Sequence, residues 1–137
     1  DNVKPPFIEA IDQKLVDKPL FTVWLEREGQ HDNVPGGVFT YGAIDTTNCG
    51  PIIAFEPLSS ATYFQFKMKA VSFGSYSISG GWEVISDTGT SLIGAPNDIA
   101  QQIADSVGAT FDYFLELYII DCDAQIPDFK VVIGSTT

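Results

Sequence analysis

The chain has 137 residues, enough for one ordinary domain with a hydrophobic core. Its 18 acidic and 7 basic residues give a net charge of −11, which argues against nucleic acid as a partner because phosphates would be repelled. Apolar content of 45% argues against a disordered chain, and no apolar stretch is long enough to cross a bilayer, so we expect no membrane association.

The acidic residues are spread thinly along the chain, which is typical of a solvated surface. The functional alternative is that the protein works in an acidic compartment, where many of its carboxylates are protonated and its net charge falls toward zero. The chain begins at Asp1 without a Met or a signal-like segment, so we expect it to be processed or cut from a longer protein.

Two cysteines, Cys49 and Cys122, are compatible with one disulfide in an oxidising compartment, although two cysteines alone do not establish it. They are not spaced like a zinc site. The single histidine, His31, lies in a polar loop with no cysteine cluster nearby. We therefore expect no metal and no cofactor.

The first predicted element is a short amphipathic helix over residues 5–18, which Pro19 ends. A β-strand follows at residues 20–25, where β-branched and aromatic side chains dominate. A polar hairpin loop at 26–35 leads to a second strand at 38–41. A turn is then predicted at residues 45–50.

A longer strand is predicted at residues 62–73, where Phe64, Phe66, Met68 and Ala70 alternate with polar neighbours. We expect a turn rich in Ser and Gly at 74–81. A further strand, residues 82–86, leads directly to Asp87.

A second helix is predicted from Pro96, a residue suited to the first helical position, to Gly108, a favourable C-cap. Two more strands are predicted at residues 114–120 and 129–133. The sequence therefore predicts a mostly β fold of packed antiparallel sheets with two short helices.

The most informative motif is Asp-Thr-Gly-Thr-Ser at residues 87–91, which places a carboxylate on a tight turn directly after a strand. Gly89 lets a ligand approach the backbone closely, and the hydroxyls on either side can bond the carboxylate or a substrate. Two such aspartates held together share one proton, so one can activate water while the other acts as an acid. This chain has only one Asp-Thr-Gly, so the partner carboxylate must come from elsewhere.

This motif, with Leu92 and Ile93, resembles the second active-site signature of pepsin-like aspartic proteases, the family of pepsin and cathepsin D. Further segments resemble the C-terminal lobe of that family in the same order: the interlobe segment and first strand at 15–25, the Gly-Gly run ending at Asp45, the strand at 63–66, the helix at 96–108 and the Pro-Asp turn at 126–129. The resemblance implies a pepsin-like acid protease lobe, with residues 1–19 as an interlobe segment carrying a short helix and residues 20–137 as a partial C-terminal lobe.

The resemblance also implies roles for single residues. Asp87 matches the second catalytic aspartate, and Gly89 and Thr90 match positions that contact the substrate backbone. Ser91 matches a neighbouring polar contact, with bracing of the aspartate loop as the alternative. Tyr63 and Ile85 match residues lining primed-side subsites, with an ordinary core position as the alternative for both.

Two parts of the family pattern are absent from this sequence: the N-terminal lobe with the first Asp-Thr-Gly, and the strands that follow the position of Gly134. Cys122 matches a family cysteine whose partner lies in that later segment, whereas Cys49 has no counterpart in pepsin. Cys49 is therefore left with three alternatives: a bond to Cys122, a bond to the later segment, or no bond.

The resemblance implies an aspartic-type endopeptidase that acts on peptides and proteins at acidic pH, is inhibited by pepstatin-like compounds, and works in a secreted or lysosomal setting. The missing N-terminal lobe would supply the second aspartate. The alternative is an inactive fragment that at most binds peptide or a partner protein. A homodimeric, retroviral-type protease is disfavoured, since those chains carry the motif near their start and here 86 residues precede it.

Overall fold

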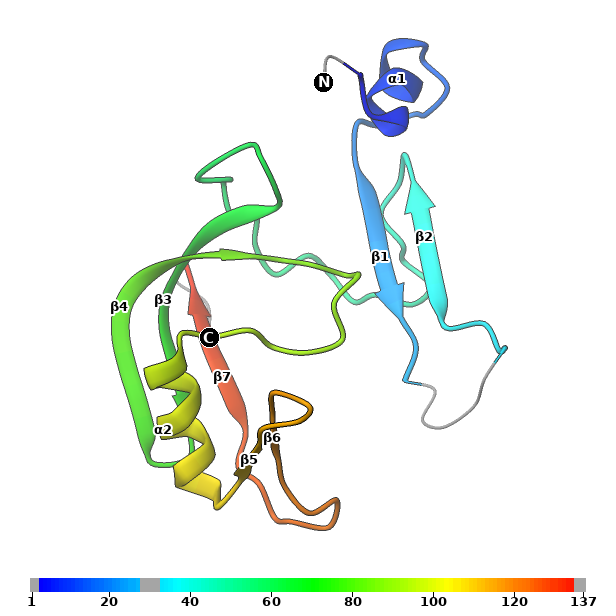
Figure 1. The fold of residues 1–137 in the computed structure, drawn as a ribbon. Helices are drawn as coiled ribbons and strands as arrows, with labels where there is room; N and C mark the ends of the chain where they lie inside the picture. Colours follow the sequence, from blue (N-terminus) through cyan, green and yellow to red (C-terminus); the bar gives the residue numbers. More distant parts are fainter. Residues whose placement is uncertain (1–2, 28–32, 135–137) are drawn as a thin grey trace. The chain divides into compact units, whose positions relative to one another are not determined.

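The computed structural model describes residues 3–27 and 33–134, and the chain divides into two compact units, residues 1–53 and residues 54–137 (Figure 1). We call these the N-terminal unit and the C-terminal unit. His31 and much of the loop predicted at 26–35 lie outside the described residues. The prediction that the chain divides at residue 19 into an interlobe segment and a partial lobe stays a prediction.

The N-terminal unit begins with α1 (Pro6–Asp12), which is shorter than the helix predicted over residues 5–18. Lys14, two residues after the helix, has a φ of 57°, which a right-handed helix does not accept. The Leu15 N–H then bonds the Ala10 carbonyl at 2.9 Å, so the chain turns away instead of adding a further helical turn.

A two-stranded antiparallel sheet follows, made of β1 (Phe21–Leu25) and β2 (Gly37–Tyr41). The ring of Phe7 on α1 lies 5.5 Å from the rings of both Phe21 and Tyr41, centroid to centroid. This aromatic cluster packs the helix against the end of the hairpin.

The turn predicted at residues 45–50 is confirmed, and a buried carboxylate organises it. Asp45 accepts hydrogen bonds from the N–H groups of Thr47 (2.9 Å) and Asn48 (3.0 Å) and from the Asn48 side-chain amide (2.7 Å). These bonds, the Asn48 side-chain amide first, hold the pKa of Asp45 below its usual value.

The C-terminal unit contains a three-stranded antiparallel sheet in the order β4–β3–β7, with bounds β3 (Gln65–Phe73), β4 (Tyr76–Ile85) and β7 (Phe129–Ile133). The turn predicted over residues 74–81 is wrong, because β4 already starts at Tyr76 and pairs with β3 at residues 76–79 and again at 82–85. Ser and Gly have low strand propensity, but pairing with a neighbouring strand overrides it here. Only Gly74, with a φ of 60°, and Ser75 remain in the turn.

The alternation predicted along β3 holds only for its first part. Phe66 and Met68 are more buried than Lys67 and Lys69 between them, as expected. The register then shifts between Met68 and Ala70 against both neighbouring strands. Such a bulge moves the buried face from even to odd positions, and Val71 and Phe73 become the buried residues of the strand.

The helix predicted at residues 96–108 is confirmed as α2 (Asn97–Val107), which Gly108 ends with a φ of 73°. Its buried residues are Ile99 and Ala104, and Figure 1 shows the helix beside the sheet.

The strand predicted at residues 114–120 is confirmed only in part, because β6 (Leu117–Ile119) lies within it but pairs with β5 (Thr110–Asp112) in a hairpin whose turn takes up residues 113–116. Asp112 accepts hydrogen bonds from the N–H groups of Phe114 (2.8 Å) and Leu115 (3.0 Å), and Glu116 has a φ of 56°. The apolar run 113–115 therefore lies in a turn, since the aspartate side chain competes with strand pairing for its backbone.

The observed architecture confirms the predicted fold class, which is mostly β with antiparallel sheets and two short helices. Within residues 3–27 and 33–134, no helix combines the length and apolar character that a membrane span requires.

Candidate active site

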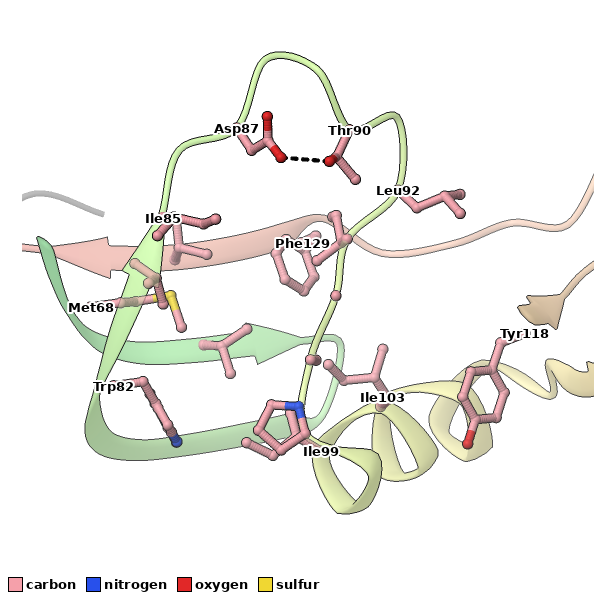
Figure 2. Close-up of a pocket in the computed structure, with 18 of the residues that line it drawn as sticks. Met68, Trp82, Ile85, Asp87, Thr90, Leu92, Ile99, Ile103, Tyr118 and Phe129 are labelled. Atoms are coloured by element: carbon pink, nitrogen blue, oxygen red, sulfur yellow. Dashed lines mark hydrogen bonds between the residues drawn. The ribbon is translucent and has the colours of Figure 1, made fainter. Parts of the chain in front are cut away.

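Asp87 lies in an exposed loop that follows β4 in the C-terminal unit. The N–H of Ser86 bonds the carbonyl of Phe64 at 3.0 Å, which ties the chain to the start of β3 just before the loop leaves the sheet. Figure 2 shows the loop arching away from β4 and returning toward α2, with Asp87 and Thr90 on its two sides.

The Asp87 carboxylate is braced from within its own loop. Its Oδ2 accepts a hydrogen bond from the Thr90 hydroxyl at 2.6 Å, and its Oδ1 accepts one from the Gly89 N–H at 2.9 Å. A Cβ at residue 89 would lie 3.3 Å from Oδ1, so glycine allows this close approach. The Thr90 hydroxyl first, and the Gly89 N–H second, hold the pKa of Asp87 below its usual value, because both favour the ionised carboxylate.

An apolar cavity of about 860 Å³ lies beside this loop, between the sheet and α2. Ile85, Asp87 and Thr90 belong to its lining, and Figure 2 shows Asp87 and Thr90 at one side of it. Most other lining residues are apolar side chains from β3, β4, α2 and β7, among them Met68, Trp82, Ile99, Ile103 and Phe129. If the apolar side chains of a peptide bind in this cavity, the Asp87 carboxylate lies beside the bound peptide and can act on it.

The remaining predicted site residues are placed differently. Gly89 and Ser91 lie in the loop next to Asp87 but do not line the cavity. Thr90 is the hydroxyl that bonds the carboxylate, and the bracing considered for Ser91 stays a prediction. Tyr63 lies in a turn before β3 and is 67% exposed, and Ile85 is 50% exposed, so neither is a core residue of this unit.

Several cavity residues have no site role predicted from the sequence, among them Trp82, Glu83 and Phe129. Glu83 is the other acidic side chain in the lining, and its carboxylate accepts hydrogen bonds from the Ser59 hydroxyl and from the Gln65 amide (3.0 Å). The Ser59 hydroxyl first, then Gln65 and Lys67, lower the pKa of Glu83. In the sequence, the feature that could have marked Trp82 and Glu83 as neighbours of the site is their position in the strand that leads to Asp87.

Cys49 lies in the N-terminal unit and Cys122 in the C-terminal unit, both as free thiols, so the proposed disulfide stays a prediction. Over residues 3–27 and 33–134, no group of three or more His, Cys, Asp or Glu side chains is placed to hold a metal ion.

Comparison with known proteins places these features in a family. The model of the eukaryotic aspartyl protease family matches residues 1–137. The chain is 55% identical to "Aspartic protease 6" and 48% identical to "Aspartic protease 1", both of Caenorhabditis elegans, with 100% and 98% of the chain covered. It is 34% identical to "Rhizopuspepsin-2" of Rhizopus niveus over 98% of the chain. The chain spans 34–35% of the length of these relatives. The chain therefore belongs to the eukaryotic aspartyl protease family, the pepsin family.

Proposed function

We propose that this chain is the C-terminal part of an aspartic-type endopeptidase and that Asp87 is one of its two catalytic aspartates. The observation that carries the proposal is the Asp87 carboxylate, which two loop donors hold at the edge of an apolar cavity. Membership of the aspartyl protease family supports it. The second aspartate would come from an N-terminal lobe that precedes these residues in a longer polypeptide.

The bonds to Asp87 suit one of the two roles in such a pair. Peptide hydrolysis by paired carboxylates needs one ionised member, which takes a proton from water, and one protonated member, which gives a proton to the substrate. Thr90 and Gly89 donate to the ionised form of Asp87 and lower its pKa. These bonds favour the ionised carboxylate of Asp87, and a pair that shares one proton needs one ionised member.

The neighbouring residues would hold the peptide. Gly89, Thr90 and Ser91 would contact the substrate backbone beside Asp87, while Tyr63 and Ile85 would contact side chains on the primed side. Their exposure supports this assignment, because side chains that bind substrate must be accessible. Pepstatin-like inhibitors would occupy the same positions, and a secreted or lysosomal compartment would supply the acidic pH.

The second candidate is a catalytically inactive fragment that binds peptide or a partner protein. The isolated chain contains one Asp-Thr-Gly, and a coupled catalytic pair loses most of its activity when one member is absent. The large apolar cavity beside Asp87 would still be available to a bound chain.

A cleavage assay separates the two candidates. A quenched fluorescent peptide with an apolar–apolar scissile pair would be incubated at pH 3 to 7 with the isolated chain and with the longer polypeptide that also carries the N-terminal lobe. We expect acidic, pepstatin-sensitive cleavage only from the longer form. Asp87→Asn should reduce it by roughly 10⁴-fold or more, whereas Asp98→Asn, a matched change at an exposed site, should not. Cleavage that survives Asp87→Asn would reject the catalytic assignment, and a folded, inactive longer form would favour the binding candidate.

A further inference from the structure

A second hollow, of about 300 Å³, lies on the C-terminal unit between α2 and the β5–β6 hairpin. It shares only Tyr118 with the large cavity beside Asp87, and no role proposed above uses it. We call it the aromatic hollow, and its lining consists of Asn97, Gln101, Phe111, Tyr113 and Tyr118.

Three aromatic rings form the walls of the aromatic hollow. Phe111 and Tyr118 face each other across the hairpin, with ring centroids 5.0 Å apart and planes at 62°. Tyr113 lies 5.1 Å from Phe111 with the planes at 85°. Because the rings stand at steep angles rather than in a stack, they present π faces in more than one direction. Such faces attract a cation through the ring quadrupole.

The polar side of the aromatic hollow offers oxygen acceptors. Gln101 is held in place, since its amide donates to Asp105 Oδ1 at 2.7 Å and its Oε1 accepts from the Tyr118 hydroxyl at 3.0 Å. Asn97 lies one helical turn earlier and is exposed. A donor that enters the hollow therefore finds the Gln101 amide oxygen beside the Tyr118 ring, with the Asn97 side chain in the same lining.

The segment of chain that forms the aromatic hollow carries charge of one sign. Residues 97–123, which include α2 and the whole hairpin, contain no Lys, Arg or His. The same segment has six acidic residues: Asp98, Asp105, Asp112, Glu116, Asp121 and Asp123. A cationic group would be attracted to this region, whereas an anionic one would be repelled.

We propose that the aromatic hollow is a docking site for an arginine side chain of a basic peptide or protein segment, separate from the Asp87 region. A guanidinium is planar, stacks on aromatic rings and presents several N–H donors, which suit the Asn97 and Gln101 oxygens. A neutral sugar could also use rings and amides, but it would gain nothing from the negative charge of the segment that forms the hollow. Charge complementarity therefore favours the basic segment.

The test measures binding, so its result does not depend on catalysis. A fluorescein-labelled peptide with arginines spaced by Gly and Ser would be titrated with the full chain carrying Asp87→Asn, and anisotropy recorded at low and high salt. The matched probe replaces each arginine with citrulline, which keeps the shape and removes the charge. We expect the arginine peptide to bind more tightly than the citrulline peptide, and binding to weaken as salt is raised.

Two neighbouring residues in the hairpin turn provide a matched pair of variants. Tyr113 lines the aromatic hollow and is 87% exposed, while Phe114 does not line it and is 93% exposed, so neither change should disturb folding. Tyr113→Ser should weaken binding by about fivefold, the size of an exposed cation–π contact, and Phe114→Ser by less than about twofold. Asn97→Ala, which removes another lining side chain, should also weaken binding of the arginine peptide.

Several results would overturn the proposal. These are equal losses for Tyr113→Ser and Phe114→Ser, equal binding of the citrulline peptide, or displacement of the arginine peptide by chitohexaose. Displacement by pepstatin would place the peptide beside Asp87 instead of in the aromatic hollow. None of these outcomes bears on the cleavage assay for the proposed protease activity, so failure of one proposal can be told from failure of the other.

Discussion

The hydroxyl of Thr90 lies 2.6 Å from Oδ2 of Asp87, the shorter of the two hydrogen bonds that the loop makes to this carboxylate. A charged acceptor makes such a bond stronger than a neutral pair would. Because Thr90 is only three residues further along the chain, the motif itself supplies both of these donors to its aspartate.

Removal of the Thr90 hydroxyl should raise the pKa of Asp87. Thr90→Val keeps the shape of the side chain and removes the donor that contributes most to the lowered pKa. The pKa would be read from the ¹³Cγ chemical shift of Asp87 as a function of pH. Thr90→Ser should keep the pKa of Asp87 low, and Ser91→Ala should leave this pKa unchanged from wild type. An unchanged pKa in Thr90→Val would contradict the assignment of Thr90 as the main donor.

The same variant should have a defined effect on stability at low pH. The folded-state pKa of Asp87 lies below its value of about 4 in an unfolded chain, so the stabilisation is fully present above about pH 4. It is lost as the pH falls through the folded-state pKa. Urea denaturation should therefore show wild type and Thr90→Val farthest apart above about pH 4 and converging in stronger acid. A gap that widens in acid would contradict this sign.

The core beneath α2 should depend on Ile99. This side chain is 6% exposed and points into the space between the helix and the sheet (Figure 2). Ile99→Ala should reduce the free energy of unfolding by about 2–5 kcal/mol, measured by urea denaturation. Gln102→Ala, on an exposed position of the same helix, should change it by less than about 0.5 kcal/mol. Similar losses for both would contradict the assignment of Ile99 to the core, since alanine is the better helix former at either position.

The aromatic cluster should hold α1 on its hairpin. Phe7→Ala removes a half-buried ring that contacts both Phe21 and Tyr41, and should cost about 2 kcal/mol of local stability. Hydrogen exchange should speed up at the amides of β1 and β2. Ile8→Ala, at a more exposed position of α1, is the control and should leave exchange in the strands nearly unchanged.

The turn after β2 should depend on the Asp45 carboxylate. Asp45→Ala removes the acceptor for the Thr47 and Asn48 N–H groups, so both amides should exchange faster with solvent. In wild type, protection should be lost as pH falls through the lowered pKa of Asp45, since the protonated group accepts these bonds less well. Asp17→Ala, at an exposed site of the same unit, should not change exchange at these two amides.

Local patterns were sufficient for several elements. The helix over residues 96–108 carried its boundaries in the sequence, with Pro96 at its start and Gly108 at its end. The Asp-Thr-Gly turn was likewise recognisable, because the residues that bond Asp87 lie two and three positions after it. The mostly β content could be predicted from the alternation of apolar and polar residues and from the turn residues between the strands.

Other features depend on contacts between distant residues. Whether residues 76–81 form a strand or a turn depends on their pairing with β3, which outweighs the low strand propensity of Ser and Gly. The bulge near Met68 changes which side chains face the core, and it depends on pairing with both β4 and β7. No local pattern marks such a shift, because its energy comes from fitting three strands together.

The same division applies to the sites. The sequence alone indicated the family, through the motif at residues 87–91 and the further segments that match in order, and both donors to Asp87 lie within that motif. The cavity beside Asp87 and the aromatic hollow combine residues separated by tens of positions, such as Met68 with Phe129 and Asn97 with Tyr118. Their side chains meet only because the sheet, α2 and the hairpin pack together, so burial and shape at these sites are decided by the tertiary structure.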